Sequence, residues 1–132
     1  MKATIIKNGL FARLLTATLI ALAIAINAHA DWTTEGDVTT FTDYVGFSED
    51  GTMYSGIVSL RMENVVDSGK IKIITTIVNI EPAPGFTYSI RKSGGVNGTV
   101  EIEFASATCS SRFSFLYKPG ATKIDYGVMR CQ

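Results

Sequence analysis

Beyond residue 30 the chain is dominated by β-branched side chains, and this feature constrains its fold more than any other. Residues 31–132 hold nine Ile, nine Val and twelve Thr, against two Leu and four Ala. β-branched side chains are stiff and pack well on a pleated sheet, whereas Leu and Ala favour helices. The composition therefore predicts a mainly β domain.

Short turn sequences divide this region into segments of strand length. Residues 100–104 alternate charged and apolar side chains, as a half-buried strand does. Residues 113–117 place three aromatic side chains on one face, and residues 41–47 are expected to form the first strand. Residues 71–80 are apolar on both faces, which predicts a central strand. Residues 56–66 fit both a strand and a helical stripe, and we favour the strand.

The first 30 residues have the three parts of a secretory signal peptide. Lys2, Lys7 and Arg13 form a basic region, residues 14–26 are a largely apolar run of 13 residues, and Ala28-His29-Ala30 is a cleavage site. The apolar run is short for a bilayer span, which needs about 20 residues. We therefore expect export to the periplasm, the cell surface or the medium, with residues 31–132 as one domain.

Export gives meaning to the two cysteines, Cys109 and Cys131. In an oxidising compartment a cysteine pair usually forms a disulfide. Closing a loop of about 22 residues stabilises a chain by roughly 3 kcal/mol. We expect this disulfide, and it bears directly on the structure of the C-terminus.

Two structures fit the C-terminus after Pro119-Gly120. In a hairpin, residues 113–117 pair with residues 124–128, but matched apolar faces then leave the cysteines on opposite sides unless a bulge intervenes. In a short helix, a T-x-x-D capping pattern begins at Thr122, and Cys131 falls on the apolar face. We favour the helix, held on the sheet by the disulfide.

The resulting fold prediction is an antiparallel sheet of about six to seven strands with a short C-terminal helix tethered by a disulfide. An all-β sandwich or a small barrel is the alternative.

The order of these segments resembles the surface-adhesin protein E-like family. Asp31-Trp32 is similar to the Trp-containing opening of that family, residues 100–104 leading to Cys109-Ser110-Ser111-Arg112-Phe113 are similar to its Cys-bearing strand, and residues 119–131 are similar to its terminal segment. The resemblance implies an exported adhesin-like protein whose terminal helix is tied to the sheet by its last cysteine.

The charged residues exclude several classes of function. Residues 31–132 carry nine basic and twelve acidic side chains and no histidine, because the one histidine, His29, lies in the signal segment. This excludes a Ser-His-Asp triad, a Cys-His pair and a His-ligated metal site. An acidic domain also lacks the basic face that nucleic acids need. We expect no catalysis, no cofactor and no metal.

The candidate binding residues are one aromatic side chain and four basic ones. Trp32 lies close to the expected mature N-terminus, where it is a candidate surface contact. Arg91 and Lys92 lead into one Gly-rich loop, and Lys70 and Lys72 flank another turn, so that the four form a candidate patch for an acidic partner or a polysaccharide. We expect the carboxylates of Glu101 and Glu103 to be paired with Lys or Arg across the sheet.

The sequence favours a small exported binding domain that contacts a protein, envelope or matrix partner. The alternative is a periplasmic inhibitor or immunity-type protein that blocks an enzyme by inserting a loop, formed by residues 82–85 or 94–98.

Overall fold

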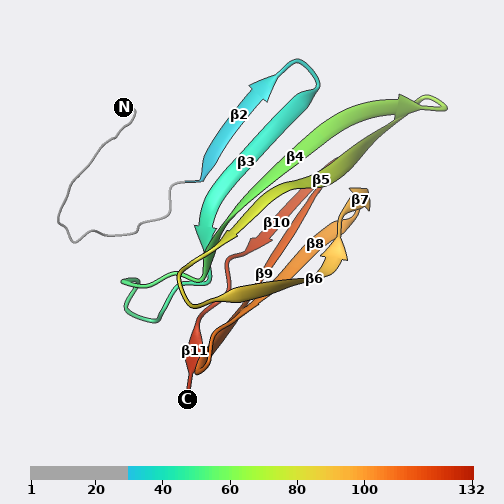
Figure 1. Ribbon diagram of the computed structural model, residues 1–132. Coiled ribbons are helices and arrows are strands. Elements are labelled where there is room, and N and C mark those ends of the chain that lie inside the picture. The colour runs from blue at the N-terminus through green and yellow to red at the C-terminus, as the bar shows by residue number, and fades with distance from the viewer. Residues whose placement is uncertain (1–29) are drawn as a thin grey trace.

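Two antiparallel sheets account for the secondary structure of residues 30–132, which are the residues described by a computed structural model of the chain (Figure 1). The first sheet has the order β2 (Asp31–Glu35), β3 (Val38–Val45), β4 (Gly56–Asp67), β5 (Lys70–Pro82), β7 (Gly95–Val96). The second has the order β10 (Ala121–Asp125), β9 (Cys109–Lys118), β8 (Thr99–Ala105), β6 (Thr87–Ser93), and β11 (Arg130–Cys131) also pairs with β9. The prediction of a mainly β, antiparallel chain is confirmed, but the single sheet of six to seven strands is wrong, because the strands divide between two five-stranded sheets.

The two sheets pack face to face around one apolar core. In β4, Val58, Leu60 and Met62 are buried and their neighbours are not, which is the period of two that places alternate side chains on one face. The ring of Phe41 from the first sheet lies 4.9 Å, centroid to centroid, from that of Phe115 in the second. Burying an aromatic side chain of this size stabilises the fold by roughly 1.5–3 kcal/mol. Shared aromatic packing therefore holds the layers together.

The expected strands at residues 56–66, 100–104 and 113–117 are confirmed as parts of β4, β8 and β9. The central strand expected at residues 71–80 is a strand, but it is not buried on both faces: Ile71 and Val78 are each 59% exposed. The β4–β5 hairpin projects beyond the second sheet, which leaves Ile71 near its tip uncovered (Figure 1). Val78 is the extra residue of a β-bulge opposite Ser59 and Leu60.

The C-terminal helix was predicted wrongly. The described residues contain no helix, and therefore none that could span a membrane. Ile124 pairs with Phe115 in a hairpin closed at Pro119-Gly120, and Cys131 pairs with Cys109. The predicted disulfide between these cysteines is present.

A break in the last strand explains how the hairpin and the disulfide coexist. Asp125 lies opposite Ser114 and Arg130 lies opposite Ser110, so five steps along the chain face four steps along β9. The extra residue reverses the face on which later side chains lie. It thereby brings Cys131 onto the side of Cys109.

The residues of this break, Tyr126–Gly127–Val128–Met129, form a strap that crosses to the first sheet. The Gly46 N–H donates to the Tyr126 carbonyl over 2.8 Å, and the Met129 N–H donates to the Phe47 carbonyl over 2.6 Å. Gly127 has a φ of 76°, a left-handed conformation that a helix interior does not allow. These hydrogen bonds between sheets stabilise the strap more than the local capping and i, i+4 pattern would stabilise a helix.

We predict that Gly127→Ala destabilises the protein far more than Gly120→Ala. Both glycines have positive φ, which costs an alanine about 1 kcal/mol. A Cβ at Gly127 would also collide with the Arg112 carbonyl oxygen, whereas Gly120 has open space. Urea unfolding of the oxidised protein should show a loss of about 3 kcal/mol or more for Gly127→Ala and about 1 kcal/mol for Gly120→Ala. Equal losses would contradict the strap geometry.

Candidate functional site

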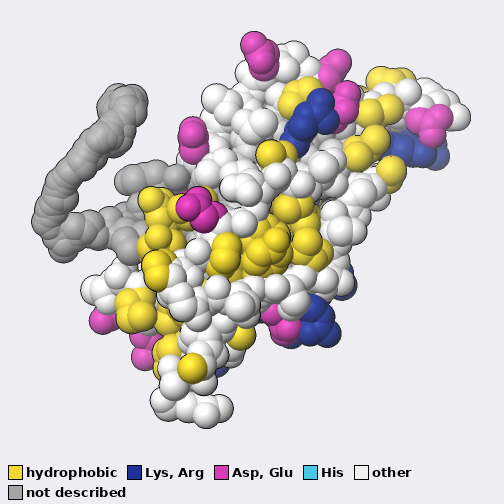
Figure 2. All heavy atoms as spheres, viewed as in Figure 1, with side chains coloured by type: hydrophobic (Ala, Val, Ile, Leu, Met, Phe, Trp, Pro, Cys, Tyr) yellow, Lys and Arg dark blue, Asp and Glu magenta, His cyan; other side chains and the backbone are white. Residues whose placement is uncertain are grey.

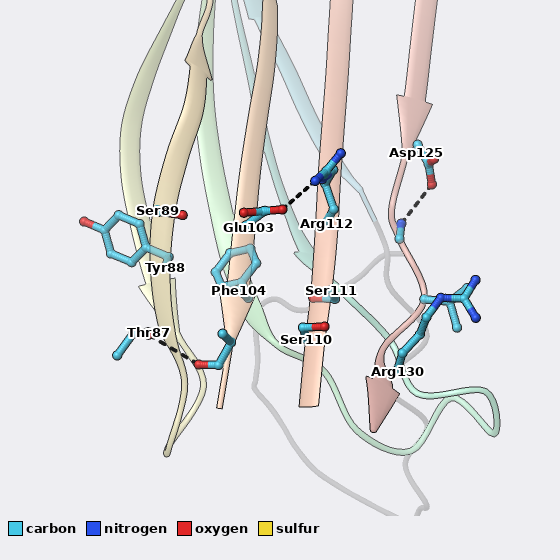
Figure 3. Close-up of a pocket in the computed structure, with 13 residues that line it drawn as sticks. Thr87, Tyr88, Ser89, Glu103, Phe104, Ser110, Ser111, Arg112, Asp125 and Arg130 are labelled. Atoms are coloured by element: carbon cyan, nitrogen blue, oxygen red, sulfur yellow. Dashed lines mark hydrogen bonds and ion pairs between the residues drawn. The ribbon is translucent and has the colours of Figure 1, made fainter. Parts of the chain in front are cut away.

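A groove with a volume of about 560 Å³ lies on the outer face of the second sheet (Figure 3). Its floor is formed by β8 and β9, one side by β6, and the other by the strap and β11. The side chains that give it polar character are Thr87, Ser89, Glu103, Ser110, Arg112, Asp125 and Arg130. Phe104 and Ser111 also line it, but their side chains are buried on the opposite face of the sheet.

Ion pairs join three strands beside this groove. The Glu103 carboxylate on β8 forms ion pairs with two guanidinium groups, that of Arg91 on β6 at 2.6 Å and that of Arg112 on β9 at 2.5 Å. Glu101 lies two residues earlier on the same face of β8, 3.3 Å from Arg112 and 3.8 Å from Lys92. The predicted pairing of both glutamates with Lys or Arg across the sheet is confirmed. On β8 and β9, period-two alternation places Glu101, Glu103 and Arg112 on the outer face. Arg91 and Lys92 are consecutive on β6, and the register irregularity after Ile90 brings both of them into the ladder.

The ladder keeps the Glu103 carboxylate ionised. Hydrogen bonds from Arg112, and then from Arg91, hold the pKa of Glu103 below its ordinary value. A carboxyl group that acts as a general acid near neutral pH needs a raised pKa instead. Glu103 is therefore suited to positioning arginine side chains rather than to donating a proton.

Arg130 stands on the other side of the groove, where the strap returns to the second sheet (Figure 3). Within residues 30–132 it forms no salt bridge. The nearby Asp125 carboxylate accepts a hydrogen bond from the Gly127 N–H over 2.9 Å, and Val128 exposes about half of its surface. Arg130 thus offers an unpaired guanidinium group beside an exposed apolar side chain.

The two sheets differ strongly in charge, although residues 31–132 together are only mildly acidic. The strands of the second sheet carry six basic and three acidic side chains, and those of the first carry three basic and six acidic. The remaining carboxylates, Asp37, Glu49 and Asp50, lie in connections of the first sheet. The groove therefore lies on the positive layer of a polar molecule.

The four basic residues predicted as a patch lie on different sheets. Arg91 and Lys92 belong to the ladder on the second sheet. Lys70 and Lys72 lie at the tip of the β4–β5 hairpin, where Lys72 pairs with Asp67 at 2.9 Å. None of the four lines the groove, although Arg91 and Lys92 lie beside it in the ladder.

Trp32 also lies away from the groove, on β2 of the first sheet. It is 39% exposed, and its ring packs edge-on against Phe41, with centroids 4.8 Å apart. This exposure agrees with the predicted surface position.

The residue that sequence reasoning missed is Arg130. It stands one position before Cys131, and the predicted disulfide placed that position next to the Cys-bearing strand. The helix prediction hid the consequence, because only the β11–β9 register places Arg130 opposite Ser110 at the groove.

The two loops considered for enzyme inhibition are tied to the first sheet. The Ala83 N–H donates to the Ser55 carbonyl over 2.8 Å, and Ala83 is buried. In the other loop the Asn97 N–H donates to the Ile73 carbonyl over 2.7 Å, and the Asn97 side chain accepts from the Ile73 N–H. Both loops are therefore anchored close to the sheet.

Ser111 does not act as an exposed nucleophile in this arrangement. Its hydroxyl is buried and donates to Ser55 Oγ over 2.7 Å, and Ser55 in turn donates to the Gly46 carbonyl over 2.9 Å. Buried hydroxyls with satisfied hydrogen bonds serve packing, here across the two sheets. Ser110 remains at the groove surface.

Comparisons of the chain with protein-family models, with curated proteins and with solved structures find no match. The groove and its charges are thus the basis for a functional proposal.

We predict that Arg112→Met raises the pKa of Glu103 toward its ordinary value, since Arg112 donates the hydrogen bond that lowers it most. A carboxylate with a lowered pKa stabilises the fold above its unfolded-state pKa, and this contribution is lost as the pH falls through the folded-state pKa. In the mutant, Glu103 should therefore become protonated at a higher pH, and its remaining ion pair with Arg91 should be lost earlier as the pH falls. Carboxyl NMR titration measures the pKa of Glu103, and Arg61→Met, which removes a pair on the other sheet, is the control. An unchanged Glu103 titration in Arg112→Met would contradict the assignment.

Proposed function

We propose that the protein is an exported, non-enzymatic binding domain that contacts a protein or cell-envelope partner through the outer face of its second sheet. The observation that carries this proposal is the separation of charge: the second sheet is positive, while the first sheet and its connections are negative. In such a domain the positive sheet attracts an acidic partner surface, and the negative sheet repels it.

The chemistry of the groove supports binding through an exposed arginine. Arginine is enriched where protein surfaces meet, because its planar guanidinium forms two parallel hydrogen bonds with a carboxylate or a phosphate. Arg130 has no ion pair within the described residues, while Arg112 is already positioned by Glu101 and Glu103. An acidic group of a partner would complete the pairing of Arg130 beside Val128.

Three observations support a non-catalytic role. Glu103 is held ionised, Ser111 is buried, and the chain's one histidine belongs to the segment that we propose is removed on export. Export itself is supported by the signal-like sequence and by the disulfide, which is typical of oxidising compartments.

An adhesin-like role is one form of this proposal. The resemblance to the surface-adhesin protein E-like family implied a terminal helix, and the chain has β10 and β11 there instead. The proposal therefore depends on the charged layer and not on the family. The inhibitor alternative gains no support, because both candidate loops are hydrogen-bonded to the first sheet.

We predict that Arg130→Glu strongly weakens capture of the partner, whereas Lys70→Glu does not. Both substitutions change the net charge by the same amount, but Lys70 lies on the first sheet and away from the groove. Immobilised wild-type protein and both variants are exposed to envelope and matrix extracts, and retained proteins and polysaccharides are quantified. Arg130→Glu should reduce specific retention at least about tenfold, and retention by the wild type should fall with added salt.

An equal loss in both variants would show that net charge alone governs retention. No specific retention by the wild type would also reject the proposal. Because Arg130 is exposed, urea unfolding should confirm that the Arg130→Glu protein is folded.

A further inference from the structure

The outer edge of β2 carries no partner strand in the described part of the chain. β2 pairs with β3 and with no other strand among residues 30–132 (Figure 1). Edge strands leave backbone N–H and C=O groups without strand partners, and proteins normally protect them with Lys, Pro, bulges or a covering segment. The sequence of β2, DWTTE, has neither Lys nor Pro, and its register with β3 runs without a bulge.

The other edges of the two sheets are protected. β6 carries Arg91 and Lys92 and has an irregular register with β8 at that point. β10 carries Lys123 and ends in the strap. β5 is partly covered by β7 and contains the Val78 bulge and Pro82. Among these edges β2 alone lacks a basic side chain, a proline and a bulge, and we take this contrast as the basis for a binding role.

Trp32 gives the β2 edge an apolar anchor. Its ring packs against Phe41, with centroids 4.8 Å apart, and lies within 6.1 Å of two aromatic rings of the second sheet, yet it keeps 39% of its surface exposed. An indole held by aromatic neighbours loses little conformational freedom when a partner covers it. A side chain from an added strand would lie beside it at the spacing of a cross-strand pair.

Two threonine side chains of β2 contact threonines of β3. Thr33 pairs with Thr40 through hydroxyl groups 2.6 Å apart, and Thr34 pairs with Thr39 at 3.1 Å. These contacts fix the strand before a partner arrives.

The charges at the ends of β2 favour one kind of added strand over another. Asp31 and Glu35 end the strand, Asp37 follows in the turn, and none of the three forms a salt bridge within the described residues. Acidic side chains lie around the β2–β3 hairpin in the space-filling view (Figure 2). A second copy paired antiparallel on β2 would set Asp31 against Glu35 twice, and like charges directly opposite are unfavourable. A strand with basic ends complements the site.

We propose that the β2 edge accepts an extended segment of another protein as an added strand, with basic residues at both ends and an apolar side chain beside Trp32. Main-chain hydrogen bonds would supply affinity, and Trp32 and the terminal carboxylates would supply specificity. This site is on the opposite sheet from the groove and does not depend on the function proposed for it.

The test uses the single tryptophan of the chain as its reporter. The protein is titrated with the capped peptide KTVTVTK, with ETVTVTE, and with KTVPVTK, in which proline cannot continue a ladder of hydrogen bonds. We expect a saturable blue shift of Trp32 fluorescence with KTVTVTK, binding at least about tenfold weaker for both other peptides, and slower hydrogen exchange of the β2 amides.

Matched variants separate the edge from the rest of the sheet. Thr33→Lys places a protecting charge on β2 and should weaken peptide binding about tenfold, whereas Thr76→Lys, the same change at an exposed position of β5, should not. Arg130→Glu should bind the peptide like the wild type, so that failure of the groove and failure of the edge remain distinguishable. Circular dichroism and urea unfolding confirm that each variant is folded.

The proposal is overturned if KTVTVTK leaves Trp32 fluorescence and β2 exchange unchanged, or if the proline and acidic peptides bind equally well. It is also overturned if sedimentation shows a dimer whose β2 amides are protected without peptide, because a second copy then occupies the edge.

Discussion

The strap at Tyr126–Gly127–Val128–Met129 is the constraint on which the C-terminal half of the structure depends. Hydrogen bonds from Gly46 and Met129 join it to the connection after β3, so the chain leaves the second sheet, touches the first and returns. The detour adds one residue against β9, and that single residue reverses the facing of everything after it. It sets Cys131 against Cys109 and Arg130 beside the groove, so that the disulfide and the site share one cause.

The charged side chains lie on the outside of the two layers, because each sheet has an inner face that is buried and an outer face that is exposed. The inner faces meet in an aromatic core in which Phe41, Phe113 and Phe115 are fully buried. Charged side chains are thereby confined almost entirely to the outer faces and edges, since an unpaired charge in the core would be costly. Asp43 is the buried exception, and burial together with its carboxylate raises the pKa of the Tyr126 phenol on the strap. Most basic side chains lie on the second sheet and most acidic ones on the first, so the two outer surfaces have opposite sign although the net charge is small.

Much of the fold could be predicted from local patterns, and the failures have physical causes. Residues 100–104 alternate so regularly that they predict both a strand and the paired glutamates outside it, and β8 has both. The helix prediction failed because a helix cap is worth only about 1 kcal/mol and an i, i+4 pair only about 0.2–0.5 kcal/mol. Pairing with β9 and hydrogen bonds to the first sheet satisfy the same backbone groups. Gly127 would weaken a helix, but it is the residue that the strap requires, because its φ is positive and a Cβ there would collide with the Arg112 carbonyl.

The candidate site was harder to predict than the fold. Arg91 and Lys92 were identified, but they were grouped with Lys70 and Lys72 because all four flank Gly-containing turns. Turns that are alike in sequence can lie on different sheets, and here they do. Arg130 could not be found in the same way, because the face that it occupies depends on the register shift between β10 and β11, which no local sequence pattern predicts.

Local patterns and composition are enough to predict that this protein is mainly β, that charged side chains occupy outward positions of its strands, and that its cysteines pair. These properties follow from side-chain stiffness, alternation and redox chemistry, which act over a few residues or on composition. The division of the strands between two sheets, the cations that share a face, and the edge of β2 that has no partner strand within residues 30–132 became visible only in the folded chain. Such features depend on pairing between segments far apart in the chain. The free energy of that pairing comes from packing and hydrogen bonds that exist only after the sheets have formed.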